Sequence, residues 1–289
     1  MVNTKIKSGG DNLETDRMLY ELLEDELKVN LDEEVEAPPI SISFGTHSSY
    51  SKRDGSTIEQ TPIGTDGNFS FVQAPPKTMK TFFVSLLVSS YLKSGNKFGT
   101  SKMKSNRKGR DVLHFDTEQG RWHCLRGFRK VSDMANAEND KGYHTYSLRK
   151  IDYKTRLGFI EYKLEQAKKG SIGLVIIDGL ADLVVDVNNM EESNLCVQKL
   201  MLWSTKYNCH IITVIHSNYG SDKPTGHLGS TCEKKSECQI SLSKQEENNL
   251  IVDVTCKRSR NRLFENFSFF INKAGFPEVI DTNVPDIDF

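Results

Sequence analysis

The stretch that decides the fold runs from residue 68 to residue 83 and reads NFSFVQAPPKTMKTFF. Its first part, Phe69–Val72, is short and apolar and predicts a β-strand. A tight loop follows and ends at Lys80 and Thr81, and the apolar spacing of Phe82–Leu92 then predicts a helix. This order is the layout of a phosphate-binding P-loop, in which loop N–H groups and a helix N-terminus face phosphate oxygens.

The loop departs from the usual pattern G-x-x-x-x-G-K-[ST] at both glycines, where Ala74 and Met79 stand. Glycine is favoured there because the loop needs positive φ angles and a close approach of its backbone to the phosphates. Two interpretations of this stretch alone are therefore open: a nucleotide-binding loop, or a strand-to-helix turn that carries a lysine. In the first, the contact residues are Ala74, Pro75, Pro76, Lys77, Thr78, Met79, Lys80 and Thr81.

The composition narrows the class of protein. A chain of 289 residues can hold one large α/β domain with extensions. With a formal net charge of −1, the whole protein has no overall electrostatic attraction to nucleic acid or to anionic membranes. Any basic surface must therefore be confined to part of the protein. The six cysteines form no CxxC pair, and no apolar run reaches the ~20 residues of a membrane span. We expect a cytoplasmic protein with reduced thiols and no membrane partner.

Three parts are expected along the chain. Residues 1–39 read as a mobile extension with a helix over Thr15–Val29 and an acidic tether that ends at Pro39. That helix is either solvated or a docking helix for a neighbouring subunit. Residues 40–280 read as one domain that begins with a short β-rich lead-in, and residues 281–289 as a loose tail.

Apolar runs and helix patterns alternate through the middle of the chain. The expected strands are Asp111–Phe115, His144–Leu148, Gly173–Ile177 and His210–Ile215, and the expected helices are Trp122–Met134, Tyr153–Lys168 and Met190–Tyr207. Such alternation predicts an α/β fold with a mainly parallel sheet covered by helices on both faces. Later runs at Cys238–Leu242, Leu250–Cys256 and Phe267–Ile271 are separated by gaps too short for crossovers, which predicts antiparallel strands.

Three of these strands end at candidate ligands. Lys80 and Thr81 follow the first strand, Glu118 follows the second, and Asp178 closes the run Gly173–Ile177. Ligands bind beyond the carboxyl ends of parallel strands, so these side chains are expected to converge. Asp178 with Thr81 would hold magnesium, or Asp178 is only a turn residue. Glu118 would activate a water molecule, or it is only a helix N-terminal acid favoured by the helix dipole.

Two further groups complete the candidate site. His216 and Asn218, at the end of the fifth strand, are expected either to bind the γ-phosphate or to be structural. Arg260 and Arg262 lie between two antiparallel strands, where they are merely solvated or reach the γ-phosphate of a neighbouring subunit. The basic segment Lys93–Arg110 is expected to be a flexible loop, either solvated or bound to a phosphate backbone.

Taken together, the motifs resemble the RecA-like ATPase core shared by replicative ring helicases and strand-exchange recombinases. The matching motifs are PPKTMKT (75–81), VLHFDTEQ (112–119), LVIIDGLADLV (174–184), ITVIHSN (212–218), GHLGS (226–230) and SRNR (259–262). A glutamate after the second strand, apart from the Walker B aspartate, distinguishes that group. More narrowly, the chain resembles RepA-type ATPases of plasmids, phages and mobile elements, some of which, in Bacteroidetes, have glycine-poor P-loops.

The resemblance implies a specific function. It implies ATP and Mg²⁺ as cofactors, single-stranded DNA as a partner and assembly into a ring or filament that serves replication or mobilisation with partner proteins. Lys97–Arg110 and Asn218–Ser230 would be the loops nearest DNA. An alternative from another class is a nucleotide-binding regulatory or scaffold protein that hydrolyses little ATP. A site that binds no nucleotide is the third interpretation.

Overall fold

The computed structural model describes residues 13–51, 55–93, 98–168, 170–218 and 221–280. The chain divides into two compact units, Met1–Ala37 and Pro38–Phe289. The first contains helix α1 (Leu13–Leu27), on which Met18, Leu22 and Leu27 are all exposed. The expectations for residues 1–12, Lys97 and residues 281–289 lie outside the described residues.

The second unit is built on a large sheet with the strand order β12-β11-β10-β9-β3-β8-β7-β5-β6. The strands are β3 (Phe69–Ala74), β5 (Asp111–Asp116), β6 (Tyr143–Ser147), β7 (Ile172–Asp178), β8 (His210–His216), β9 (Cys238–Lys244), β10 (Ile251–Ser259), β11 (Phe267–Ile271) and β12 (Pro277–Ile280). From β9 to β6 all neighbours are parallel, whereas β9 to β12 pair antiparallel. The predicted α/β fold with C-terminal antiparallel strands is confirmed.

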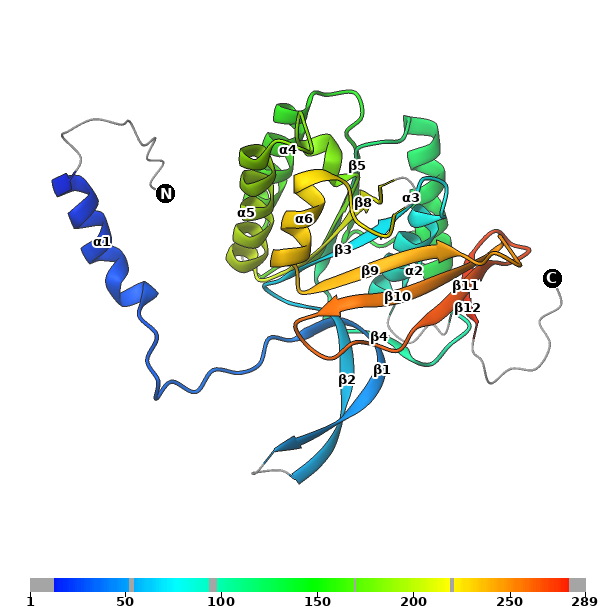
Figure 1. The fold of residues 1–289 in the computed structure, drawn as a ribbon, viewed down its shortest axis with the longest axis horizontal. Helices are drawn as coiled ribbons and strands as arrows, with labels where there is room; N and C mark the ends of the chain where they lie inside the picture. Colours follow the sequence, from blue (N-terminus) through cyan, green and yellow to red (C-terminus); the bar gives the residue numbers. More distant parts are fainter. Residues whose placement is uncertain (1–12, 52–54, 94–97, 169, 219–220, 281–289) are drawn as a thin grey trace. The chain divides into compact units, whose positions relative to one another are not determined.

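Helices cover both faces of this sheet (Figure 1). They are α2 (Lys80–Leu92), α3 (Arg121–Ala135), α4 (Tyr153–Gln166), α5 (Met190–Tyr207) and α6 (Gly226–Lys235), with a short 3₁₀ turn at Leu180–Leu183. One apolar cluster joins the sheet to α2 and α3, and a second joins it to α4, α5 and α6. Both β3 and β7 are buried along their whole length, and β7 accordingly reads as an apolar run up to Asp178, whereas β3 also contains the buried polar residues Ser70 and Gln73.

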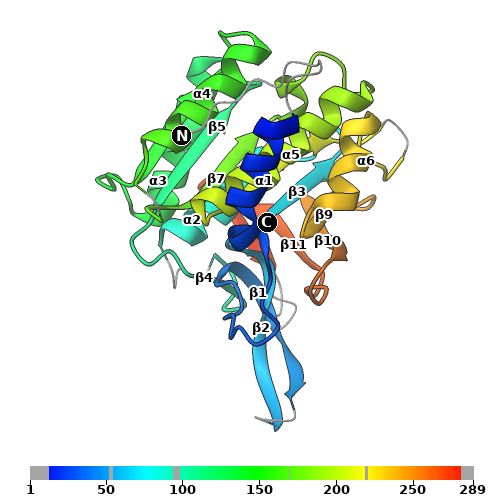
Figure 2. The same cartoon turned by 90° about the vertical axis from the view of Figure 1, so that its left-hand side faces the viewer.

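A long hairpin extends away from the large sheet in both views (Figures 1 and 2). Its strands are β1 (Ile40–Ser51) and β2 (Gly55–Thr65), and β1 also pairs with β4 (Met103–Ser105) in a three-stranded sheet. Ile42, Phe44 and Ile63 at the base of the hairpin are buried, so the base belongs to the core. The expected β-rich lead-in is therefore an ordered hairpin.

Three expectations from the sequence need correction. The segment before β5 is not uniformly a flexible loop, because β4 lies in it and because Arg107 and Arg110 form ion pairs with Asp140 and Asp66. The segment 226–230 is the first half of α6 and not a loop. β12 was not predicted, because its four residues include Pro277 and show no clear alternation.

None of the described helices is long and apolar enough to cross a membrane.

Candidate functional site

The loop between β3 and α2 adopts left-handed backbone conformations without glycine. Lys77 has a φ angle of 62° and Met79 one of 57°. Met79 occupies one of the two usual glycine positions, and the structure keeps there the conformation for which glycine is favoured. Ala74, at the other position, ends β3 and has no positive φ. Met79, at a usual glycine position, and Lys77, at a position that the pattern leaves open, therefore both hold a strained left-handed backbone.

Lys80 begins α2 and its ammonium group is held by three acceptors. It donates to the carbonyl oxygens of Ala74 (3.3 Å) and Pro75 (2.9 Å) and to Nδ1 of His216 (3.1 Å). Burial lowers the pKa of Lys80, and the nearby carboxylates of Glu118 and Asp178 partly oppose this shift. The side chain is thus a buried cation with no acid in direct contact among the described residues.

Glu118 is connected to Lys80 by the hydrogen bonds of His216. Because an ammonium group can only donate, Nδ1 of His216 accepts from Lys80, and Nε2 then donates to Glu118 Oε1 at 3.0 Å. This hydrogen bond lowers the pKa of Glu118, so its carboxyl is ionised at neutral pH. Asp116 fixes the turn by accepting from the backbone N–H groups of Glu118 (3.1 Å) and Gln119 (2.8 Å).

Thr81 and Asp178 meet at the neighbouring strand end. Thr81 Oγ1 donates to Asp178 Oδ2 at 3.4 Å, and Gln119 Nε2 donates to Thr81 Oγ1 at 3.4 Å. Thr117 ties β5 to β7, with its hydroxyl 3.0 Å from the carbonyl oxygen of Asp178 and 2.8 Å from Oδ2 of Asp182.

Magnesium fits this donor set. Burial and the charges of Asp116 and Glu118 raise the pKa of Asp178 to about 7. A desolvated carboxylate crowded by two others is stabilised by a cation, and hydroxyl and carboxylate oxygens are hard ligands that suit Mg²⁺. Thr81 and Asp178 would hold the ion, with phosphate oxygens and water filling the other positions.

Lys80, Thr81, Glu118 and His216 line a cavity of about 540 Å³, called here the P-loop cavity. Asp178, which is hydrogen-bonded to Thr81, is not among its lining residues. Its wall is formed by the loop Pro76–Thr81, the first turns of α2 (Phe82 and Ser85), Glu118, Gln119, His216 and one face of α3 (His123, Arg126, Gly127 and Lys130). The α3 face was not predicted. The sequence feature that could have revealed this face is the spacing i, i+3, i+4, i+7 within the expected helix, which places the four residues on one side.

Some predicted site residues lie outside this cavity. Ala74 and Pro75 do not line it, although their carbonyls hold Lys80. Asn218 pairs its backbone with Lys223 and is not among the lining residues. The remaining two predicted site residues are Arg260 and Arg262.

Arg260 and Arg262 follow β10, which runs antiparallel to β9, and so lie at the opposite end of the strands from the P-loop. Arg260 donates to the carbonyl oxygen of Lys235 at 2.8 Å, and Arg262 is exposed. These two arginines therefore do not reach the P-loop cavity of their own chain.

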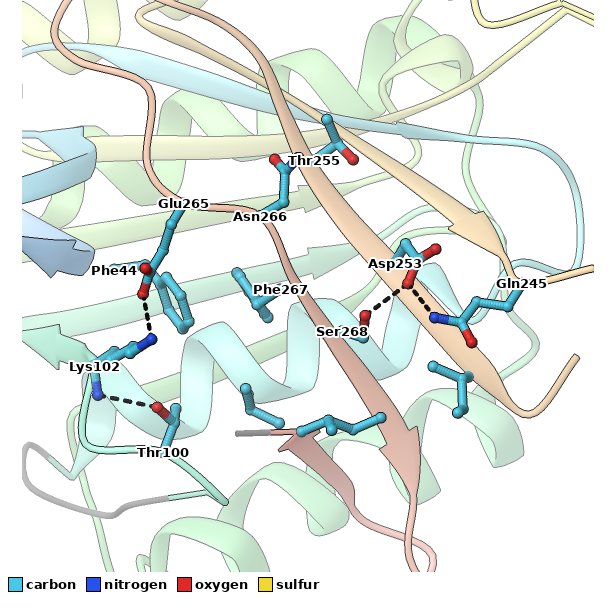
Figure 3. Close-up of a pocket in the computed structure, with 13 residues that line it drawn as sticks. Phe44, Thr100, Lys102, Gln245, Asp253, Thr255, Glu265, Asn266, Phe267 and Ser268 are labelled. Carbon is cyan, nitrogen blue, oxygen red and sulfur yellow. Dashed lines mark hydrogen bonds and ion pairs between the residues drawn. The ribbon is translucent and has the colours of Figure 1, made fainter. Parts of the chain in front are cut away.

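A second cavity of about 560 Å³ lies against β10, β11 and β12 (Figure 3). Its polar groups satisfy one another: Lys102 pairs with Glu265 at 2.8 Å. Asp253 accepts hydrogen bonds from Gln245 (2.7 Å) and Ser268 (2.6 Å). This cavity offers no cluster of cations.

Comparison with known proteins identifies a family and a fold for this chain. The family described as an AAA domain matches residues 63–222, more than half of the sequence. No curated protein matches significantly. A crystal structure of the RadB recombinase matches with a TM-score of 0.51 and 15% identity, covering 75% of this chain and 92% of that one. At this identity the match shows a common RecA-like fold alone, and solved structures with such a match are numerous.

Proposed function

The chain belongs to the AAA domain family and has the RecA-like P-loop ATPase fold, and on this premise we propose that it hydrolyses ATP with magnesium as a helicase-like motor on DNA. The observation that supports the ATPase part is that Lys80, Thr81, Glu118 and His216 line one cavity and that Thr81 is hydrogen-bonded to Asp178. The motor role on a plasmid, phage or mobile element rests on the resemblance of the motifs to RepA-type ATPases.

Each residue has a defined role in the proposed reaction. Lys80 binds the β- and γ-phosphates. Thr81 and Asp178 would hold magnesium, which when bound would supply positive charge to the phosphates. Glu118 takes a proton from the attacking water as the new oxygen–phosphorus bond forms. The bond from the γ-phosphorus to the bridging oxygen breaks, and ADP and inorganic phosphate are released. His216 contacts both Lys80 and Glu118, so it can report whether the γ-phosphate is present.

The arginines would act in a neighbouring copy of the chain. Because Arg260 and Arg262 lie at the far end of the strands, they can meet a γ-phosphate only in a ring or filament in which that end approaches the next P-loop. Mixing two inactive variants, Arg260→Ala and Glu118→Gln, tests this role. Partial recovery of turnover is expected, since some interfaces then pair an intact Glu118 with an intact arginine.

Turnover itself is tested by phosphate release with and without single-stranded DNA. We expect DNA to stimulate the wild type, and Glu118→Gln to lower turnover by at least about 100-fold while ATP binding persists. Glu165→Gln, an exposed acid on α4, is the matched control and should keep full turnover. Equal rates in wild type and Glu118→Gln would contradict the role of Glu118.

One observation favours a nucleotide-binding switch or scaffold as the second candidate. Lys80 is held by two carbonyl oxygens of its own loop, and two loop residues are strained. A loop that must rearrange before it meets phosphates would turn ATP over slowly. ATP binding by the wild type without phosphate release, with or without DNA, would favour this candidate.

A further inference from the structure

Two cations on α3 face the P-loop across the cavity. Arg126 and Lys130 lie four residues apart on the face of α3 that lines it. Like charges at this spacing repel one another and destabilise a helix. Among the described residues, neither cation forms an ion pair with an acid. Arg126 is exposed and Lys130 is half-buried at the cavity wall, so both charges are accessible to an anion from solution.

The position of Lys130 brings this charge close to the P-loop. Its ammonium nitrogen lies 4.1 Å from the ring centroid of Phe82, the residue that directly follows Thr81. The guanidinium of Arg126 lies 4.8 Å from the ring centroid of Trp122 on its own helix. Burial and the charge of Arg126 lower the pKa of Lys130, which indicates that the ammonium group is partly desolvated. Aromatic contacts therefore hold both cations without neutralising them.

The charge of the whole lining is consistent with a polyanion. Four lysine and arginine side chains line the P-loop cavity against the single carboxylate of Glu118, namely Lys77, Lys80, Arg126 and Lys130. A glycine-poor loop with strained residues approaches phosphates less readily with its backbone N–H groups. Cations from the opposite wall can supply the missing contacts.

We propose that Arg126 and Lys130 bind the phosphate chain of the nucleotide from the α3 side, so that the polyphosphate is held between the P-loop and α3. This inference rests on the proposed function, since it assigns further residues to the same nucleotide. Gly127 lies between the two cations on the cavity wall, and an added Cβ there would meet nothing within 4 Å. The helix backbone thus leaves room for the ligand between them.

The test measures binding of two probes, ATP and inorganic tripolyphosphate, by titration calorimetry of the full chain. Arg126→Gln and Lys130→Gln should each weaken both probes by about tenfold, as expected for the loss of one charge-assisted hydrogen bond. Lys130→Arg keeps the charge and should restore affinity. Arg129→Gln, an exposed cation on α3 outside the cavity, should bind both probes like the wild type.

The outcomes separate this inference from the proposed function. Weaker ATP binding with unchanged tripolyphosphate binding would overturn it, because the cations would then hold the base or ribose. Unchanged binding of both probes would overturn it as well, and leave Lys80-dependent binding intact. If the wild type binds neither probe, the proposed function is contradicted, and the inference that rests on it is overturned with it. Thermal unfolding of each variant checks that the fold survives, because Lys130→Gln also removes the cation over the Phe82 ring.

Discussion

The P-loop cavity and the second cavity have nearly the same volume, about 540 and 560 Å³, and differ in how their charges are satisfied. In the second cavity one lysine and two acids pair with each other or with neutral donors. In the P-loop cavity four lysine and arginine side chains face one carboxylate, and that carboxylate accepts a hydrogen bond from His216. Volume therefore does not identify the site, whereas uncompensated charge does.

The largest difference in stability is expected at Asp178, measured without magnesium. Its pKa rises from 3.8 unfolded to about 7 folded, so the folded state binds the proton more tightly. Stability contributed by this group therefore falls as pH rises from about 4 to 7 and stays low above that range. Asp178→Asn removes the penalty and should stabilise the protein at pH 8 by up to about 4 kcal/mol, with little change near pH 4.

Urea unfolding at several pH values measures this effect. The matched variant in the second cavity is Asp253→Asn, which weakens hydrogen bonds from Gln245 and Ser268 and should bring no gain at pH 8. If Asp178→Asn changes the free energy of unfolding by the same amount at pH 5 and pH 8, the carboxylate is not desolvated. The contrast between the two cavities would then be wrong.

A smaller effect is expected at Lys77, where conformation and charge can be separated. Lys77→Gly relieves the left-handed backbone of an exposed residue and should stabilise the fold by roughly 1 kcal/mol. Lys77→Ala keeps the strain and should bring no such gain. Both variants lose a cation of the P-loop cavity and should bind ATP more weakly. If Lys77→Ala binds ATP as tightly as the wild type, the lysine is not part of the site.

The smallest effect is expected in the second cavity. Lys102→Gln breaks a partly exposed ion pair with Glu265 and should change stability by less than about 1 kcal/mol. ATP affinity should not change, since this cavity lies against β10 to β12 and shares no lining residue with the P-loop cavity. A marked loss of ATP affinity in this variant would show that the second cavity takes part in nucleotide binding.

The sequence predicted the parts of the site that follow strands. Asp178 ends β7, Glu118 closely follows β5, and Lys80 follows β3 after a short loop. Parallel strands end at one edge of a sheet. The convergence of these side chains could therefore be predicted without coordinates. The geometry agrees, as His216 bridges Lys80 and Glu118.

The parts that depend on packing were not predicted. Which face of α3 lines the cavity depends on how this helix packs against α2, so the place of Arg126 and Lys130 could not be derived. α6 was missed because its sequence, GHLGSTCEKK, contains two glycines and little apolar periodicity. The ion pairs of Arg107 and Arg110 join residues 33 and 44 positions apart, a separation that local patterns do not reveal.

The most direct test of the central claim is calorimetric titration of ATP with magnesium into the wild type, Lys80→Ala and Lys102→Gln. We predict that the wild type and Lys102→Gln bind alike and that Lys80→Ala binds at least about tenfold more weakly, since it loses the buried cation of the P-loop cavity. Equal affinity in wild type and Lys80→Ala, or no binding by the wild type, would contradict the assignment of this cavity as a nucleotide site.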